Sequence, residues 1–283
     1  MTRYGAFNQG LHRLPALGEF LDGTIEYAYF RTPSELTATV GWGRRKYARR
    51  ARRVAQVQAI PFLCLEDGFL RSVGLGSAEP PLSIVVDDLG IYYDATQPSR
   101  LESFITKLRT SEQFVRAQAL VTAWRYARVS KYNYARDYVG SLPERYVLVV
   151  DQTRGDASIR YGMAVDTSFH RMLEAALAEN QDCTILLKVH PEAMAGHKRG
   201  HFDLGKIARI PRVQVLGEDV HPVSLIEHAE VLYVVTSQMG FEGLLWGKRV
   251  RTFGMPFYAG WGLTQDELPC PERRRPVQLK NLV

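Results

Sequence analysis

The sequence predicts an α/β protein with two domains. Apolar runs of strand length alternate with helix-like segments, which is typical of mostly parallel sheets covered by helices on both faces. The alternation forms two series that meet near residues 130–145, and 283 residues suffice for two domains that each bury a core. We therefore expect two Rossmann-like domains facing a cleft, one at residues 1–140 and one at 141–283.

The first series contains short strands, a basic helix and a long helical region. Expected strands are 3–7, 25–30, 37–43, 60–67, 82–88 and 90–94. The basic helix follows the third of these strands, and helical sequence runs from Pro98 to about Val129.

The second series alternates strands and helices more regularly. Its expected strands are 146–151, 184–190, 212–217, 231–236 and 249–253, and its expected helices are 167–179, 223–228 and 238–246. In open α/β sheets ligands bind beyond the carboxyl ends of the strands. The residues that follow these strands are therefore the candidate functional residues.

Composition and the cysteines exclude several classes of protein. With 46% hydrophobic and 23% charged residues the chain is neither disordered nor fibrous. Cys64, Cys183 and Cys270 show no C-x-x-C spacing, which argues against a disulfide framework or a zinc site. The first residues lack the apolar core of a signal peptide, and no apolar run approaches the roughly 20 residues of a membrane span. We expect a soluble, cytoplasmic protein or one attached to a membrane only at its surface.

Positive charge is concentrated in RRKYARRARR, residues 44–53. The net charge is +6 and the pI is near 9.2, which favours an anionic partner. On a helix, one side would carry the small and apolar residues Tyr47, Ala48, Ala51, Val54 and Ala55. The segment is then either a solvated amphipathic helix or a contact with an anionic lipid surface. No nucleic-acid-binding motif accompanies the charge, so we expect no nucleic acid partner.

In the second domain, charged residues follow the first two strands. Asp151 and Asp156 belong to the stretch DQTRGDAS, and Lys188 and His190 end the next strand on the same side. Lys188 and His190 would form a cationic pair at the sheet edge, although His190 could also simply end its strand before a proline.

The segment SQMGFEGLLWGK opens a helix directly after the strand at 231–236. The helix N-terminus with the Ser237 hydroxyl would receive a phosphate, or Ser237 is a plain helix cap. Gln238 belongs to the same strand end. Glu242 contacts a ribose or interacts with the helix dipole. Gly240 would allow a ligand or a neighbouring chain to approach closely.

The first domain carries LEDGFLRSVGLGS at residues 65–77. Glu66, Asp67 and Arg71 lie in a glycine-rich loop after a strand, which indicates either a functional loop or an ordinary loop with a surface ion pair. Two carboxylates, one from each domain, would suit glycosyl transfer with retention of configuration. Neither GxGxxG nor GxxxxGKS occurs, which excludes dinucleotide-dehydrogenase and P-loop proteins.

Several of these motifs together resemble those of a known family. LEDGFLRSVGLGS, PPLSIVVDDLGIYYDATQPSRLE, SKYN, VVDQTRGDASIRYG, KVHPE and VVTSQMGFEGLLWGKRVRTFGMPFYAGWGLT are similar to motifs of the capsule polysaccharide β-Kdo glycosyltransferases of Gram-negative bacteria. The resemblance covers residues from about 60 to 265, and it is to the N-terminal module of a two-module enzyme.

The resemblance implies a GT-B-like fold and a retaining transferase. The implied donor is CMP-β-Kdo, the implied acceptor is a Kdo-bearing glycolipid at the inner membrane, and the implied linkage is β-(2→4). By position in the motifs, Asp156 is the nucleophile of a double displacement and Glu66 the second carboxylate, while His190 and Ser237 contact the donor. With Lys188, Gln238 and Glu242 they form the expected donor site, and Arg71 and Arg154 are expected to hold the carboxylate of acceptor or donor. Arg154 could equally face solvent. Asp151 is either a rival nucleophile or a structural residue that braces the loop through hydrogen bonds to its N–H groups.

Three expectations accompany the resemblance. Because the chain is about half as long as the two-module enzymes, it is either one module or a truncated form. No DxD motif follows a strand, so we expect catalysis without a metal ion or other cofactor. The alternatives from other classes are a nucleotide-sugar epimerase of the same shape and a non-catalytic module that binds an anionic glycolipid.

Overall fold

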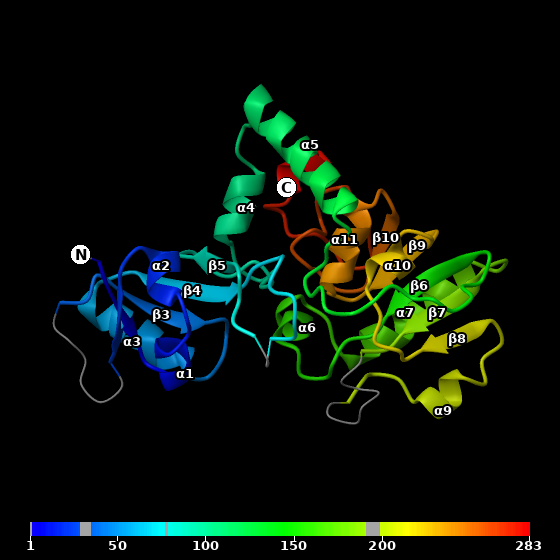
Figure 1. The fold of residues 1–283 in the computed structure, drawn as a ribbon, viewed down its shortest axis with the longest axis horizontal. Coiled ribbons are helices and arrows are strands. Elements are labelled where there is room, and N and C mark those ends of the chain that lie inside the picture. Colours follow the sequence, from blue (N-terminus) through cyan, green and yellow to red (C-terminus); the bar gives the residue numbers. More distant parts are fainter. Residues whose placement is uncertain (1, 29–34, 77–78, 191–198) are drawn as a thin grey trace. The chain divides into compact units, whose positions relative to one another are not determined.

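The computed structural model describes residues 2–28, 35–76, 79–190 and 199–283, which form two compact units (Figure 1). The first unit extends to Tyr92 and includes Pro98–Leu101, and the second contains Tyr93–Gln97 and Glu102–Val283. Each unit has its own sheet.

The first sheet has five strands in the order β2-β1-β3-β4-β5. The strands are β1 Arg3–Ala6, β2 Thr24–Tyr27, β3 Ala38–Trp42, β4 Phe62–Asp67 and β5 Ile84–Asp87. Neighbours are parallel except β4 and β5, which pair antiparallel. The helices of this unit are α1 Gln9–His12, α2 Leu17–Leu21 and α3 Ala48–Gln58.

Helix α3 packs against its sheet through small residues. Its buried residues are the alanines Ala48, Ala51 and Ala55, and the Thr39 hydroxyl of β3 donates a buried hydrogen bond of 2.9 Å to the Ala51 carbonyl. A Cβ on Gly41 would lie 2.9 Å from the Cβ of Ala48, so only glycine permits this approach. The predicted small-residue side of the basic helix is therefore confirmed.

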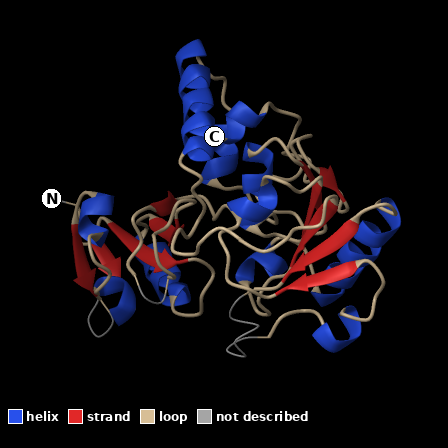
Figure 2. Cartoon of the chain, turned by 45° about the vertical axis from the view of Figure 1, so that its right-hand side comes forward, coloured by secondary structure: helices blue, strands red, loops and turns tan. Residues whose placement is uncertain are grey.

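The second sheet has six strands, all paired in parallel, in the order β11-β10-β9-β6-β7-β8 (Figures 1 and 2). The strands are β6 Tyr146–Val150, β7 Thr184–Lys188, β8 Val213–Leu216, β9 Val231–Val234, β10 Arg249–Thr252 and β11 Gln265–Asp266. All five residues of β6 are buried, which explains its unbroken apolar sequence YVLVV.

Helices pack on this sheet and extend the second unit. They are α5 Ser111–Tyr126, α6 Ala157–Tyr161, α7 Asp166–Glu179, α9 Leu204–Ile207, α10 Val223–Ile226, α11 Gln238–Leu245 and α12 Leu279–Leu282. Phe169 and Met172 of α7 are fully buried in the main core beside Val147 and Val149 of β6. Among the described residues, no helix is both long and apolar enough to cross a bilayer.

The division into units differs from the predicted boundary at residue 140. Helix α5, which was assigned to the first domain, packs on α11 and α12 of the second unit. Its Trp124 meets Phe241 edge to face, its Arg125 donates to the Leu245 carbonyl, and Arg109 just before it donates to the Asn281 carbonyl. Figure 1 shows α5 beside the C-terminus of the chain.

Two other expectations are corrected. The stretch at 90–94 forms a turn instead of a strand, because the Asp94 carboxylate accepts hydrogen bonds from the backbone and side chain of Thr96. The helical region from Pro98 is two helices, α4 Arg100–Ile105 and α5, since Thr110 forms a capping box with Gln113 and starts a new helix. Of the strand expected at 25–30, residues 29 and 30 lie outside the described residues.

Candidate active site

Two loops at the carboxyl edge of the second sheet are joined by one side chain. Strands β6 and β9 are neighbours, and Gln152 follows β6 while Thr236 follows β9. The Gln152 amide accepts from the Thr236 backbone N–H at 2.9 Å and donates to the Thr236 hydroxyl at 3.1 Å. Ser158 completes the cluster, because its hydroxyl lies 3.0 Å from that of Thr236. The DQTRGDAS loop and the TSQ loop are thus fixed to each other.

Asp151 braces the first of these loops from inside. It is only 3% exposed, and its carboxylate accepts from the backbone N–H groups of Gln152 and His201. The ring nitrogen Nδ1 of His201 lies 3.2 Å from Asp151 Oδ1 and 3.0 Å from the Gln152 carbonyl oxygen. Both neighbours are acceptors, so Nδ1 carries the hydrogen. These contacts fit the bracing role expected of Asp151.

The His201 ring is held on its other sides too. It stacks on Phe169 with ring centroids 3.6 Å apart and an interplanar angle of 2°, and its Nε2 lies 3.5 Å from Asp166 Oδ1. No local pattern selects His201, since it lies in no strand and 50 positions from Asp151. Its role depends on a tertiary contact.

Asp156 is exposed and is the N-cap of helix α6. Its Oδ1 accepts from the Ser158 backbone N–H at 2.9 Å. The preceding Gly155 has φ +82°, a conformation that other residues rarely adopt, and it turns the chain just before Asp156. One of the two loop aspartates is therefore buried and bonded, while the other is presented to solvent.

Arg154 lies on the outer side of the same loop. Its side chain is 48% exposed, its Nε donates to the Gly200 carbonyl at 3.0 Å, and it lies 3.5 Å from Asp166. Its backbone N–H donates to the Arg199 carbonyl. The segment at 199–201 therefore supports the loop from Asp151 to Arg154, before its turn at Gly155, and the Arg154 guanidinium keeps an accessible face.

Lys188 does not present its charge at the strand end as expected. The side chain is buried, and its ammonium donates to the carbonyls of Val189 at 2.8 Å and Glu218 at 2.9 Å. Burial lowers the pKa of the Lys188 ammonium to about 8, although Asp219 and Glu218 act in the opposite direction. This geometry corrects the predicted cationic pair. The Lys188 ammonium donates to two backbone carbonyls of the protein, and His190, after the same strand, is half-buried.

Ser237 is the N-cap of α11 and accepts from the Met239 backbone N–H at 3.3 Å. Capping and phosphate binding are compatible, because the cap uses the Ser237 oxygen as an acceptor and a hydroxyl can donate its hydrogen at the same time. The packing of this chain explains why position 240 is a glycine. A Cβ there would lie 2.3 Å from the hydroxyl of buried Tyr258, which itself donates to the Ser237 carbonyl. The group that approaches Gly240 closely is therefore a tyrosine of this chain, whereas the sequence suggested a ligand or a neighbouring chain.

Glu242 is buried, and three donors surround its carboxyl group. Oε2 accepts from the Ser130 hydroxyl at 2.8 Å, and Oε1 accepts from the Lys131 backbone N–H and the Gln238 side chain, both at 3.2 Å. Burial raises the pKa of the Glu242 carboxyl to about 7, although the three hydrogen bonds act to lower it. Glu242 thus attaches the SKYN segment to the first turns of α11. Its carboxyl group is buried among these donors, which does not favour a direct contact with a ribose.

In the first unit, Glu66 is the penultimate residue of β4. Its Oε1 accepts from the indole Nε1 of Trp42 at 2.8 Å and from the Asp67 backbone N–H at 3.2 Å. Trp42 ends the neighbouring strand β3, so two adjacent strand ends position this carboxylate. Trp42 was not predicted as part of a site.

Arg71 is buried inside its own loop. Its guanidinium donates to Asp67 Oδ1 at 2.9 Å, to the Ser72 hydroxyl, and to the carbonyls of Gly76 and Glu79. The predicted ion pair exists, but it is inside the loop instead of at the surface. The expected role of Arg71 as a ligand for a substrate carboxylate is not favoured, because its donors are used to hold the loop together.

Among the described residues, no group of three or more His, Cys, Asp or Glu side chains could hold a metal ion. Catalysis without a metal ion stays a prediction.

Each unit has a mostly parallel sheet covered by helices, and the functional candidates follow strand ends. The protein therefore has a GT-B-like α/β fold, the class predicted from the sequence. The chain belongs to the family described as capsule polysaccharide biosynthesis protein, whose model matches residues 37–139 and 123–281. The resemblance found in its motifs is confirmed.

Curated relatives agree with this assignment. The chain is 44% identical over 280 residues to the capsule polysaccharide modification protein LipA of Neisseria meningitidis serogroup B, covering 96% of this chain and 39% of that protein. It is 37% identical to the lipopolysaccharide-processing protein LpsZ of Rhizobium meliloti, covering 87% of this chain and 57% of that protein. The chain thus spans only part of the length of these relatives.

Two solved structures are similar over almost the whole chain. The KpsC beta Kdo 2,4 transferase of Thermosulfurimonas dismutans matches with a TM-score of 0.90 and 42% identity, covering 99% of this chain and 88% of that one. The KpsC beta Kdo 2,7 transferase of the same organism matches with a TM-score of 0.76 and 25% identity, covering all of this chain and 88% of that one.

Proposed function

We propose that this chain is a retaining β-Kdo glycosyltransferase that moves Kdo from CMP-β-Kdo to a Kdo-bearing glycolipid in capsule polysaccharide biosynthesis. The observation that carries the proposal is the likeness to the KpsC beta Kdo 2,4 transferase over 99% of the chain. Identity to that transferase is 42%, against 25% for the 2,7 transferase, which supports a β-(2→4) linkage.

In the first step, the Asp156 carboxylate attacks the anomeric carbon of Kdo. The bond from this carbon to the phosphate oxygen breaks, its electron pair leaves with CMP, and a covalent Kdo-Asp156 ester forms. The exposed carboxylate after the turn at Gly155 supports this role, whereas Asp151 is buried and bonded to His201. The buried brace holds the loop and the exposed aspartate reacts.

In the second step, an acceptor hydroxyl attacks the same carbon and releases Asp156. Two inversions restore the original anomeric configuration. Glu66 takes the proton of the attacking hydroxyl, which requires a hydrogen bond between the two groups. The hydrogen bond from Trp42 Nε1 orients the Glu66 carboxylate for this purpose.

The donor phosphate would bind at the start of α11. The Ser237 hydroxyl lies there at the helix N-terminus, and His190 follows the nearby strand β7. Arg154, which keeps an accessible face on the Asp156 loop, is the candidate for the Kdo carboxylate. CMP leaves with less charge than a diphosphate, so this chemistry is proposed to run without a metal ion.

Intact-mass spectrometry with CMP-Kdo tests the proposal directly. The protein should gain the mass of one Kdo, and the adduct should disappear in Asp156→Asn while the variant stays folded. Asp203→Asn is the matched control, because Asp203 is also an exposed aspartate that caps a helix, α9, through backbone N–H groups. Asparagine caps helices about as well as aspartate, so both variants keep their caps.

Other results would point elsewhere. An adduct that persists in Asp156→Asn and maps to another residue would remove Asp156 as the nucleophile. Release of an epimerised sugar nucleotide would indicate an epimerase, and binding of the glycolipid with no adduct and no transfer would indicate a non-catalytic module.

A further inference from the structure

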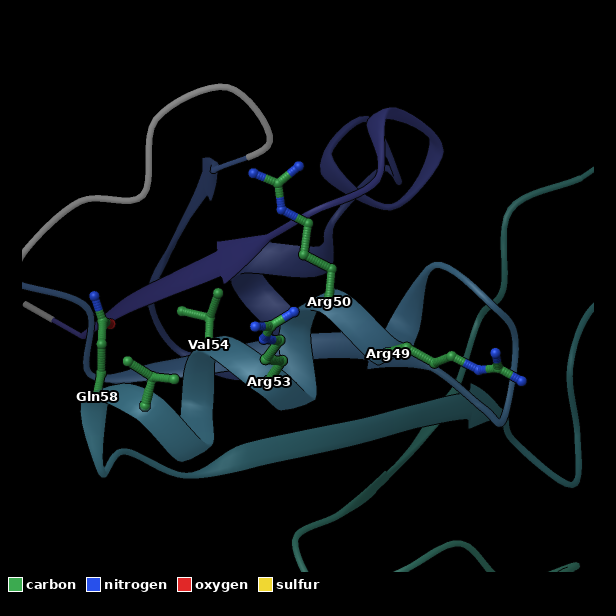
Figure 3. Close-up of a pocket in the computed structure, with 6 residues that line it drawn as sticks. Arg49, Arg50, Arg53, Val54 and Gln58 are labelled. Carbon is green, nitrogen blue, oxygen red and sulfur yellow. The ribbon is translucent and has the colours of Figure 1, made fainter.

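One face of helix α3 carries three exposed arginines. Arg49, Arg50 and Arg53 are exposed and line an open hollow of about 550 Å³ (Figure 3). The same hollow is also lined by Val54, Val57 and Gln58. None of these residues belongs to the candidate active site.

The packing of α3 explains why these side chains face outward. Alanines occupy the side that contacts the sheet, so there is no room for long side chains on that side. Two arginines of the helix also contact rings of the fold: the Arg52 guanidinium lies 4.6 Å from the Phe62 ring centroid and donates to the Gly43 carbonyl, and that of the exposed Arg50 lies 5.7 Å from the Phe7 ring centroid. Arg52 therefore supports the fold, and the outward charge belongs to its neighbours.

The sequence around helix α3 is rich in basic residues and poor in acidic ones. The sequence from Gly43 to Leu65 contains seven Lys and Arg residues and no Asp or Glu. In the part of the chain that the structure describes, no ion pair includes Lys46, Arg49 or Arg53. These cations remain available to an external anion.

An exposed apolar side chain continues the basic face. Val57, one turn after Arg53, is 78% exposed, and Val54 between them is half-buried. Basic side chains beside exposed apolar ones are typical of helices that lie at the interface of an anionic membrane. Among the described residues that line the hollow, none is an aromatic side chain on which a base could stack, which is unfavourable for nucleic acid.

From this combination we infer that the α3 face binds the surface of an anionic phospholipid bilayer through Arg49, Arg50 and Arg53, with Val57 entering the headgroup region. The inference is independent of the proposed transferase chemistry. It would place the protein at the membrane where a glycolipid acceptor is found.

Vesicle flotation tests the inference. Phosphatidylcholine vesicles with phosphatidylglycerol should bind the full chain at low salt, and vesicles of phosphatidylcholine alone should not. Binding should weaken as sodium chloride is raised beyond about 0.1 M, where charges are screened within roughly 10 Å. The triple variant Arg49→Gln, Arg50→Gln, Arg53→Gln should bind on the order of a hundredfold more weakly, since each basic side chain contributes roughly a fivefold factor.

A control of equal charge separates a local surface from general attraction. Arg116, Arg209 and Arg275 are exposed arginines elsewhere, and their replacement by Gln removes the same three charges. Equal loss of binding in both triple variants would overturn the inference, as would absence of binding to phosphatidylglycerol vesicles. A single Val57→Ser variant should weaken binding without any change of charge.

Two further measurements complete the test. Both triple variants should keep the unfolding midpoint of the parent chain and should transfer Kdo to a water-soluble acceptor at the parent rate. Failure of transfer in the parent chain would therefore count against the proposed function and leave the membrane result intact. Tight binding of an oligonucleotide that is lost in the α3 variant, without vesicle binding, would identify nucleic acid as the partner and reject the bilayer.

Discussion

The carboxylate of Asp151 and the imidazole of His201 are adjacent in the interior of the second unit, with Oδ1 3.2 Å from Nδ1. They are 50 positions apart in the sequence, and each side chain is only 1% exposed. The pair joins the end of β6 to the segment that supports the Asp156 loop. The position of the exposed Asp156 thus depends on a buried neighbour.

We expect Asp151→Asn and His201→Phe to be strongly coupled. Each should lower the free energy of unfolding by about 1–3 kcal/mol, because each leaves a buried partner without its hydrogen bond. A double-mutant cycle should give a coupling energy of roughly 0.5–3 kcal/mol. The exposed pair of Lys206 and Asp203, 3.7 Å apart, is the control and should show a coupling near zero. Additive effects at Asp151 and His201 would contradict the brace.

Glu242 should make stability fall as the pH rises. Its pKa is about 7 in the folded protein, against an ordinary value of 4.5 for glutamate, so between these values the unfolded chain releases a proton that the folded chain keeps. The folded state then loses stability up to about pH 7, by roughly 3 kcal/mol at about 1.4 kcal/mol for each pH unit. Glu242→Gln should not show this loss.

The measurement is urea unfolding of the parent chain and of Glu242→Gln at several pH values from about 4.5 to 8. The difference between the two proteins isolates Glu242 from other titrating groups. A difference that stays constant over this range would show that Glu242 titrates near its ordinary value.

Replacing Lys188 with Met should destabilise the protein and should not primarily affect nucleotide binding. The substitution leaves the carbonyls of Val189 and Glu218 without their donor, at a cost of about 1–3 kcal/mol. Lys206→Met, at a side chain that is 83% exposed, should change stability by less than about 0.5 kcal/mol. Calorimetric measurement of CMP binding by the folded Lys188→Met variant distinguishes a structural role from a binding role. A large loss of CMP affinity with unchanged stability would show that Lys188 binds the donor.

Gly240→Ala should cost about 1–3 kcal/mol, because the new methyl group overlaps the Tyr258 hydroxyl at 2.3 Å. Gly205→Ala is the matched change in helix α9, where the nearest atom, Asp203 Oδ1, would be at 3.4 Å. Alanine favours helix over glycine by up to about 1 kcal/mol, so Gly205→Ala should be neutral or stabilising. Equal thermal midpoints for the two variants would argue against a tight contact at Gly240.

The sequence was sufficient to predict the alternating elements and the strand ends. Buried parallel strands such as β6 read as unbroken apolar runs, and β7 and β9 could be located in the same way. The antiparallel pairing of β5 could not be predicted, because a short apolar strand has the same composition in either direction. The position of α5 also depends on contacts, which local sequence does not contain.

For the candidate site, local signals identified the loops but not the state of each side chain. DQTRGDAS stood out by its charge, and Asp156 is indeed the exposed aspartate. Lys188 and Arg71 looked like ligands because Lys and Arg are usually exposed, yet each is buried and bonded to carbonyl oxygens. His201 and Trp42 were missed because their partners come from other elements. Burial is set by the tertiary fold, so it could not be read from these motifs.

The side chain of Gln152 restricts how the loops of this protein can be exchanged with those of its relatives. The Gln152 amide reaches from the end of β6 to Thr236, so the loop that bears Asp156 and the loop that precedes α11 are held together as one unit. Grafting only one of them from a relative would mismatch this amide and displace both. A change of donor specificity should therefore be attempted by exchanging the two loops as a single cassette, with Gln152 and Thr236 carried over from the same parent.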